Sequence, residues 1–466
     1  MPTQAEIDSR LYPAAKQRAR ALTLEAQAPE DLGGAAYTGT MSASSVTDPE
    51  WPTLDDAALH GLAWDVVRLI ETHTEADPVS LLVSFLSEFD TMLNRTPHLI
   101  LDGSYHPFLF WQVLFGQSSK SRKSTAGRRI ESLMPIADAT WTRGESKGTL
   151  SSGEGLAYAV RDAQYQEQPI KEKGQPTGET VRICIDPGVT DKRFFLVQSE
   201  FGAVLRVMAR EGNSLSGVLR DAWDGNTLAP MTKATRVRAT DPHIGIVSHV
   251  TQDELRRNLT DTATSNGFGN RFCWFAVRRS KELPFPGTPI ESDLAAVAAR
   301  LKDALRVARG VGALRLSAST REAWGAVYHE LSADRPGMAG ALLGRAEAHV
   351  MRLAGLYALL DGRDTIDLVH INAALALWQH AEASTKMIFG DSLGDPAADT
   401  MLKAIRASGE LTDTQLSDLF GRNLSAVKLE LAKGVLAAAG LVHCVTLETG
   451  GRPRIIWRAG TKITSY

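Results

Sequence analysis

The stretch that most constrains the fold is an apolar run that ends in a short polar loop. Residues 108–115 are Phe-Leu-Phe-Trp-Gln-Val-Leu-Phe, which predicts a buried strand. Residues 116–125 follow as Gly-Gln-Ser-Ser-Lys-Ser-Arg-Lys-Ser-Thr, and a helix is expected to begin at Lys123. A strand, a polar loop and a helix that starts with Lys-Ser-Thr have the layout of a phosphate-binding loop. Backbone N–H groups and the helix N-terminus would then face the phosphates.

The loop departs from the common pattern G-x-x-x-x-G-K-[ST]. Gly116 lies one residue too early, so Gln117 and Arg122 occupy the two glycine positions, and an arginine is a poor residue for a positive φ. Two interpretations follow: a nucleotide site, or a basic, serine-rich surface loop. In the first, the residues around the phosphates are Gly116, Gln117, Ser118, Ser119, Lys120, Ser121, Arg122, Lys123, Ser124 and Thr125.

The composition restricts the class of protein. A chain of 466 residues, 43% hydrophobic and 23% charged, suits about two to four globular domains. The net charge of −3 provides no general basic field for nucleic acid, so DNA contacts would come from local patches. The three cysteines are far apart and lack metal-ligand spacing, which indicates free thiols in a reducing cytosol. With no membrane-length apolar run and no signal-peptide core, we expect a cytoplasmic protein without a membrane partner.

Two further apolar runs end in polar residues. Residues 194–197 precede Glu200, a single acid where two adjacent acids are typical of ATPases; such an acid holds Mg²⁺ or polarises water. The run 243–249 ends in Ser248 and His249. Either residue would sense a terminal phosphate if the two strands are neighbours, and the alternative is a histidine that caps the next helix.

Charged residues at three other places each allow two interpretations. Glu154 lies in the first turn of an expected helix, where it either caps the helix dipole or faces the γ-phosphate. Arg271 ends a glycine-flanked loop, which is typical of an arginine finger, although a structural salt bridge is the alternative. A basic run forms either a solvated edge strand or a DNA contact, and its residues are Lys233, Arg236 and Arg238.

The chain is expected to contain several regions of different character. Residues 1–48 predict a flexible arm, 49–98 a helical segment, and 164–179 an exposed loop. Residues 396–460 predict three helices and a glycine-rich hairpin, the arrangement of a winged helix, which binds either DNA or protein. The candidate DNA contacts of this module are Arg422, Lys428, Lys433, Arg452 and Arg454.

Six short motifs occur in a familiar order: residues 116–125, Leu-Ser-Ser-Gly-Glu-Gly-Leu (150–156), Gln-Ser-Glu-Phe (198–201), Arg-Glu-Gly-Asn-Ser-Leu-Ser (210–216), Ala-Trp-Asp-Gly (222–225) and Asn-Gly-Phe-Gly-Asn-Arg-Phe (266–272). Together they resemble a bacterial and phage family of P-loop ATPases. Its members often accompany primase-polymerases on mobile elements and look like replicative helicases. The resemblance covers residues 51–285. The run Arg345–Leu359 is similar, more loosely, to the lid of minichromosome-maintenance helicases.

The resemblance implies an α/β fold with a P-loop NTPase core of AAA+ or RecA-like type at 99–285. N-terminal helices would precede this core, and a helical lid at 290–392 and the C-terminal winged helix would follow it. It also implies ATP and Mg²⁺, a hexameric ring, single-stranded or forked DNA, and a primase-polymerase partner. Roles carried over to matching positions are phosphate binding by Lys123, Mg²⁺ coordination by Ser124 and Glu200, sensing by Ser248 or His249, and action on a neighbour's nucleotide by Arg271 and Arg345.

The sequence therefore predicts an ATP-dependent DNA-translocating motor, a ring-forming replicative helicase of a mobile element. Two other functions stay open. The first is a replication initiator or DNA-binding regulator that uses nucleotide only to assemble. The second is a catalytically weak ring scaffold, which the single acid Glu200 suggests.

Overall fold

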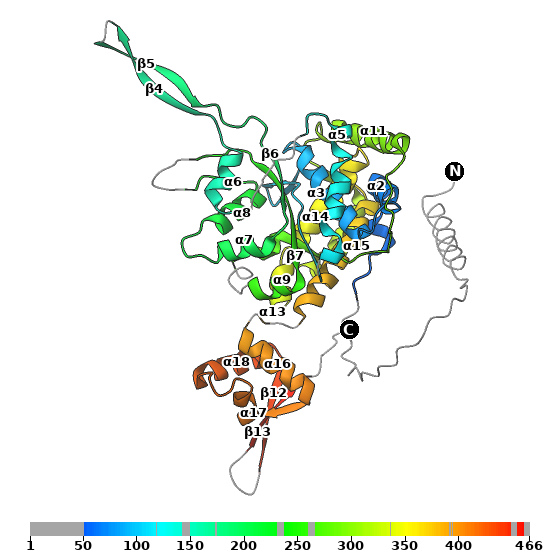
Figure 1. Cartoon of the computed structure of the whole chain (residues 1–466), viewed down its shortest axis with the longest axis vertical. Coiled ribbons are helices and arrows are strands. Elements are labelled where there is room, and N and C mark those ends of the chain that lie inside the picture. The colour runs from blue at the N-terminus through cyan, green and yellow to red at the C-terminus, as the bar shows by residue number, and fades with distance from the viewer. Residues whose placement is uncertain are drawn as a thin grey trace, which may run out of the picture. The chain divides into compact units, whose positions relative to one another are not determined.

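The centre of the fold is a four-stranded parallel sheet in the order β6-β7-β3-β8 (Figure 1). Its strands are β3 (Trp111–Gly116), β6 (Arg193–Gln198), β7 (His243–Thr251) and β8 (Phe272–Ala276). Residues of β3 and β8 are buried throughout, as expected for parallel strands covered on both faces. The expected α/β class is confirmed.

This computed structural model describes residues 51–460 apart from 118, 142–149, 173–174, 231–236, 260–265, 336, 391–392, 394 and 449–453. The predicted arm at 1–48 lies outside these residues, as do Ser118, Lys233, Arg236 and Arg452. Within the described part of the chain, no helix has the length and apolar character that crossing a bilayer requires.

Strand β3 begins three residues later than the apolar run predicts. The backbone of Phe110 is engaged by helix α3 (Pro78–Leu93) instead of by a neighbouring strand. Its N–H donates to the Asp90 carboxylate, and its carbonyl accepts the Ser87 hydroxyl at 2.8 Å. Because these bonds satisfy the backbone, the run continues as an irregular segment until Trp111.

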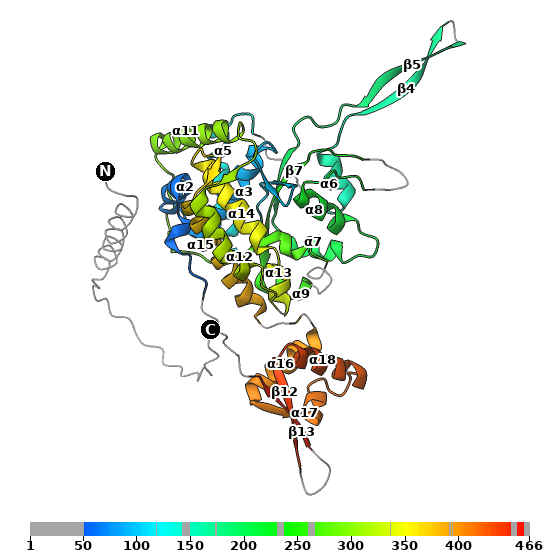
Figure 2. The same ribbon diagram turned by 180° about the vertical axis from the view of Figure 1, so that it is seen from behind.

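Two layers of helices cover the sheet, and Figures 1 and 2 show them on opposite sides of it. Alternate side chains of β3 belong to two different cores: Leu114 packs in one, Val113 and Phe115 in the other. Helices whose apolar residues join Leu114 are α2 (Gly61–Glu71), α3, α4 (Lys123–Glu131), α5 (Met134–Ala137), α11 (Glu291–Ala308), α14 (Ala346–Leu360) and α15 (Leu368–Phe389). Those on the other face are α6 (Gly153–Ala159), α7 (Phe201–Met208), α8 (Leu215–Asp224), α9 (Gln252–Asn258) and α13 (Gly337–Leu343).

Smaller elements complete this part of the chain. The hairpin β4 (Gln164–Glu172) and β5 (Gln175–Asp186) replaces the loop that the sequence predicts at 164–179, and most of β4 is exposed. That prediction was wrong because both faces of β4 are polar, so the strand lacks an apolar alternation. Other elements are η1 (Asp56–Ala58), β1 (His98–Leu101), β2 (Ser104–Pro107), η2 (Ser119–Ser121), η3 (Gly269–Arg271), β9 (Arg315–Leu316), α12 (Ala318–Leu331) and β10 (Thr365–Ile366).

Residues 396–459 have a separate hydrophobic core that includes Met401, Ile405, Leu416 and Leu436. Three helices surround a three-stranded antiparallel sheet in the order β11-β13-β12. The elements are α16 (Pro396–Ser408), β11 (Glu410–Thr412), α17 (Asp413–Asp418), α18 (Ala426–Ala438), β12 (Val442–Leu447) and β13 (Arg454–Ala459). The sequence predicts the three helices and two of the strands, but not the three-residue β11.

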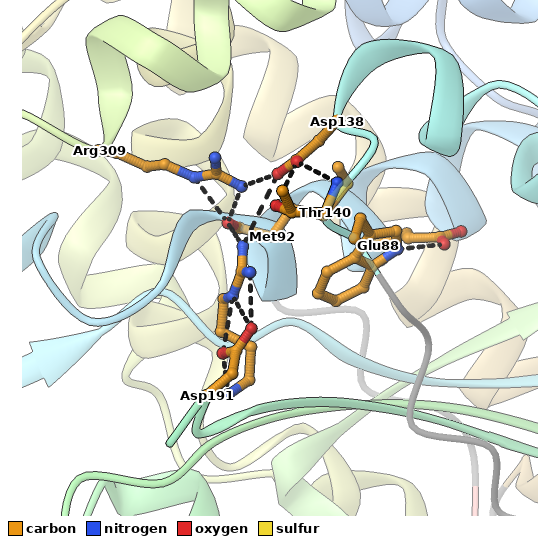
Figure 3. Close-up of polar contacts among 8 residues, drawn as sticks. Glu88, Met92, Asp138, Thr140, Asp191 and Arg309 are labelled. Carbon is orange, nitrogen blue, oxygen red and sulfur yellow. Dashed lines mark hydrogen bonds and ion pairs between the residues drawn. The ribbon is translucent and has the colours of Figure 1, made fainter. Parts of the chain in front are cut away.

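A network of polar contacts joins helix ends to the start of β6 (Figure 3). Arg309, the C-cap residue of α11, donates to Asp138 at 2.6 Å and to the carbonyl of Met92 at 2.9 Å. Arg193 of β6 donates to the same carbonyl at 3.0 Å and pairs with Asp191 at 2.7 Å. These contacts tie the C-terminal ends of α3, α5 and α11 to the sheet.

Candidate functional site

The serine-rich loop lies at the carboxyl end of β3, between the strand and helix α4. Gly116 ends the strand, and a Cβ atom there would lie 2.3 Å from Ser121 Oγ and 2.4 Å from the Val277 carbonyl oxygen. Only glycine fits this contact, because the loop folds back against the strand end. Helix α4 then begins at Lys123, so the predicted strand, loop and helix all form.

Arg122 adopts the backbone conformation that glycine usually provides. Its φ of 55° and ψ of 24° are left-handed, which costs about 1–2 kcal/mol for a residue with a Cβ. The guanidinium is held by Glu75 through an Nε to Oε2 contact of 2.7 Å, and Glu75 also accepts the Leu283 N–H at 2.9 Å. The loop therefore keeps the positive φ despite the missing glycine. Strained residues of this kind cluster at functional sites.

Lys123 and Ser124, the first residues of α4, lie beside the end of β7. Burial lowers the pKa of Lys123, and the charge of Glu254 partly opposes that shift. Ser124 Oγ is 3.4 Å from His249 Nδ1. Burial and the Lys123 charge lower the pKa of His249 to about 4, so this imidazole is neutral at pH 7.

The predicted neighbours β6 and β7 do pair, with Gln198 opposite Ser248. Ser248 and His249 point to opposite faces of β7, and the structure brings His249 to Ser124. His249 Nε2 is buried and has no hydrogen-bond partner among the described residues. A cavity of about 380 Å³ adjoins it, lined by Ser84, Ser124, Gly127, Arg128, Glu131, Phe195, Val197, Ser199, Val247 and His249.

The two candidate carboxylates lie in different surroundings. Glu200 is the exposed N-cap residue of α7, directly after Ser199, which lines the cavity. Glu154 accepts the Ser214 hydroxyl at 2.9 Å. A bond from its own backbone N–H and this contact lower the pKa of Glu154. Glu154 lies in the first turn of α6, and its carboxylate also contacts the residue that precedes α8.

The two candidate arginines come together around one indole ring. Arg271 is buried and donates to Asp224 at 2.6 Å, which agrees with the salt-bridge interpretation. Arg345 is half-buried, and its Nε donates to Asn270 Oδ1 at 3.1 Å. Both guanidinium groups face Trp223, at 5.5 and 5.1 Å from the ring centre.

Sequence reasoning missed the partners of these residues. Trp223 and Asp224 lie in the Ala-Trp-Asp-Gly motif, which was visible but had no role. Glu75 lies between two helices in a segment without a motif, so nothing in the sequence indicated its contact with Arg122. Glu254 forms a capping box with Thr251, and only the fold shows that its charge acts on Lys123.

The candidate DNA contacts that the structure describes are mostly exposed. Arg238, Arg422, Lys428 and Arg454 are exposed, and Arg422 pairs with Asp418 at 2.7 Å. Lys433 differs from them, because it is buried and pairs with Asp413 at 2.6 Å and with Glu430 at 2.8 Å. Lys433 therefore stabilises its module and is not placed to contact a phosphate.

One other cluster has the composition of a metal site. His60 Nε2 and His370 Nε2 lie 2.7 and 3.2 Å from Asp361 Oδ2. However, His370 Nδ1 accepts the Asp367 N–H at 2.9 Å. The proton of His370 is therefore on Nε2, where it donates to Asp361, and this tautomer does not bind a metal through Nε2.

In comparisons with known proteins, no family model and no curated protein matches this chain.

Proposed function

We propose that the chain is an ATP-hydrolysing motor that moves along DNA, a helicase-like protein that works as an assembly of several copies. The observation that carries the proposal is the loop 116–125 at the carboxyl end of central strand β3. Ligands of open α/β sheets bind at the carboxyl ends of strands, where connections turn to opposite sides. Strand β3 occupies such a point, because the chain passes from it to β6 on one side and later returns to β8 on the other.

The residues present suit a triphosphate. The N-terminus of α4 offers backbone N–H groups and a partial positive charge. The half-buried Lys123 ammonium would be stabilised by an anion, since burial alone disfavours its charge. Ser124 and Glu200 would hold Mg²⁺, and a bound Mg²⁺ would neutralise phosphate charge.

The proposed reaction is hydrolysis of the terminal phosphate. The oxygen of a water forms a bond to the γ-phosphorus, the bond from that phosphorus to the bridging oxygen breaks, and ADP leaves with the bonding electrons. A carboxylate accepts the proton of the water, and Glu200 is the residue we assign. His249 is neutral at pH 7 and remains so well below it. We assign the Ser124 hydroxyl as the donor to His249 Nδ1, which places the ring proton on Nε2, so that the ring would donate a hydrogen bond toward the phosphate and not act as the base.

The second half of the proposed site comes from a neighbouring copy. Arg271 and Arg345 face the same indole ring although they are far apart in the sequence, and two arginines suit the charge that develops on a transferred phosphoryl group. This arrangement favours a ring in which nucleotide binds between copies. DNA as the track, a primase-polymerase as a partner, and the winged-helix and lid assignments come from the sequence resemblance.

Replacing Lys123 tests the proposal. Lys123→Ala should lower ATP turnover by at least about a hundredfold, the effect of removing one donor to developing charge. The measurement is steady-state phosphate release with and without single-stranded DNA. Lys302→Ala, an exposed lysine on α11, is the matched control and should keep wild-type turnover. Unchanged turnover in Lys123→Ala would rule out the loop assignment.

One observation favours a different role for the C-terminal module. Helix α18, the third helix of this module, exposes Val427 and Leu431, at 79% and 62% of their surface. These residues are one helical turn apart, and Gly434 and Ala438 continue the same stripe. An apolar stripe is typical of a helix that docks on protein, whereas DNA-reading helices present polar and basic side chains. Sequence-specific binding of duplex DNA by the chain would instead favour the alternative function, a DNA-binding regulator.

A further inference from the structure

The motif Ala-Trp-Asp-Gly at 222–225 has no role in the phosphate loop, yet it ends α8 beside the candidate arginines. Gly225 closes the helix with a left-handed φ of 77°. Trp223, two residues earlier, is fully buried at 1% exposure. The indole therefore has a fixed place in the fold, and it can fix the positions of the charged side chains around it.

Three guanidinium groups face the Trp223 ring. Arg352 of α14 lies 3.6 Å from the ring centre, Arg345 at 5.1 Å and Arg271 at 5.5 Å. Arg352 is fixed by two bonds, to the carbonyls of Leu109 at 3.2 Å and of Trp223 at 3.3 Å. Cations are attracted to the face of an aromatic ring, most strongly to tryptophan. The indole is thus a platform that orders several arginines at once.

The three arginines around Trp223 have few direct carboxylate partners, although the charges of Asp90 and Glu347 also act on them. Asp224 is ion-paired with Arg271, and Arg345 bonds the neutral amide of Asn270. Burial and the nearby Arg271 lower the pKa of Arg345, and burial lowers the pKa of Arg352 to about 9. The Nε atoms of Arg271 and Arg352 are buried without a hydrogen-bond partner in the described part of the chain. An added anion would relieve this shortage.

The two candidate arginines differ in access. The Arg271 side chain is 6% exposed and held by Asp224, whereas Arg345 is half-buried at the start of α14. A ligand on another copy would therefore reach Arg345 first.

We propose that Trp223 is a positioning residue that holds Arg345 ready for the terminal phosphate of a nucleotide bound by a second copy, with Arg271 and Arg352 as its buried supports. This inference rests on the proposed function. It assigns direct phosphate contact to Arg345, and it gives the motif at 222–225 its role: Trp223 orders the guanidinium groups and Asp224 fixes Arg271.

The test mixes two variants of the full chain. Trp223→Leu keeps its own phosphate loop but loses the indole platform. This variant should have a kcat for ATP at least about tenfold below wild type, and a KM for ATP within about twofold of the wild-type value. Lys123→Ala keeps the platform but loses its own loop. In an equal mixture, about a quarter of the contacts between copies would combine an intact loop with an intact platform, so turnover should rise toward a quarter of the wild-type value. A Trp223 variant that is merely unstable would gain nothing from mixing.

The controls separate this inference from the proposed function. Trp324→Leu on α12 should keep wild-type kcat, and Trp223→Phe, which retains a smaller ring, should fall between wild type and Trp223→Leu. Wild-type turnover in Trp223→Leu would overturn the inference alone, and so would a mixture no more active than its two components. Absence of Lys123-dependent turnover in the wild-type chain would overturn the proposed function and this inference with it.

Discussion

At the scale of single residues, Arg122 shows how the loop tolerates a side chain where the pattern has glycine. Its φ of 55° is disfavoured by the Cβ, and its guanidinium contacts Glu75 at 2.7 Å. The Arg122 side chain is 44% exposed, and ion pairs of this kind contribute about 0–1 kcal/mol. The ion pair therefore offsets only part of the strain. The conformation must also be maintained by the packing of Gly116 against Ser121 and Val277.

Two substitutions at this position separate strain from charge. Arg122→Gly and Arg122→Ala both remove the contact with Glu75, but only alanine keeps a Cβ at a positive φ. The alanine variant should therefore be less stable than the glycine variant by about 1 kcal/mol. Urea unfolding of both proteins measures the difference. Equal stability would show that the loop leaves the left-handed conformation once the guanidinium is gone.

At the scale of elements, helix ends provide the polar connections between the layers. Arg309 at the end of α11, the carbonyl of Met92 near the end of α3, and Asp138 at the end of α5 meet beside β6 (Figure 3). A cation near helix C-termini interacts favourably with their exposed carbonyls. Burial raises the pKa of Asp138, but bonds from Thr140 and Arg309 outweigh it and hold that pKa at about 2.

The Asp138 carboxylate makes the free energy of unfolding depend on pH. Because the folded-state pKa of about 2 lies below the ordinary value of 3.8, the ionised group stabilises the fold above pH 4, and that contribution is lost as pH falls toward 2. Asp138→Asn should lower the free energy of unfolding by about 2 kcal/mol at pH 7. The gap from wild type should narrow below pH 4, as measured by denaturant unfolding at pH 7, 5 and 3.

The matched control for this prediction is Asp303→Asn. Asp303 is 75% exposed and lies 3.6 Å from Arg306, so it should change stability by less than about 0.5 kcal/mol at any of these pH values. A gap between wild type and Asp138→Asn that stays constant down to pH 3 would contradict the role of the ionised carboxylate.

The sequence predicts elements whose signal is local. The buried run before Gly116, the polar ends of β6 and β7, and the helix that begins at Lys123 each have a periodic or positional pattern, and the structure contains all of them. Partners from distant segments have no such pattern. Asp224 beside Arg271 and Glu75 beside Arg122 depend on packing between helices and loops, so the residue types alone could not decide between a finger and a salt bridge for Arg271.

At the scale of the whole molecule, the proposed site consists of two separate groups of residues. The loop, Ser124 and His249 form one group, and Trp223, Arg271 and Arg345 form another. A nucleotide held only by the first group would leave the arginines around Trp223 without a phosphate ligand. Assembly of copies would supply it, and nucleotide binding would then favour assembly by mass action.

Assembly of the copies should therefore depend on nucleotide. Addition of a non-hydrolysable ATP analogue with forked DNA should shift the mass distribution from single chains to a closed multimer, as measured by analytical ultracentrifugation and electron microscopy. Lys123→Ala should assemble weakly because its loop lacks the phosphate contact, and Arg345→Ala because its neighbour contact is lost, whereas Lys302→Ala should assemble like wild type. Unchanged mass with the analogue, in a preparation that hydrolyses ATP, would place catalysis within one copy and leave Arg345 a structural residue.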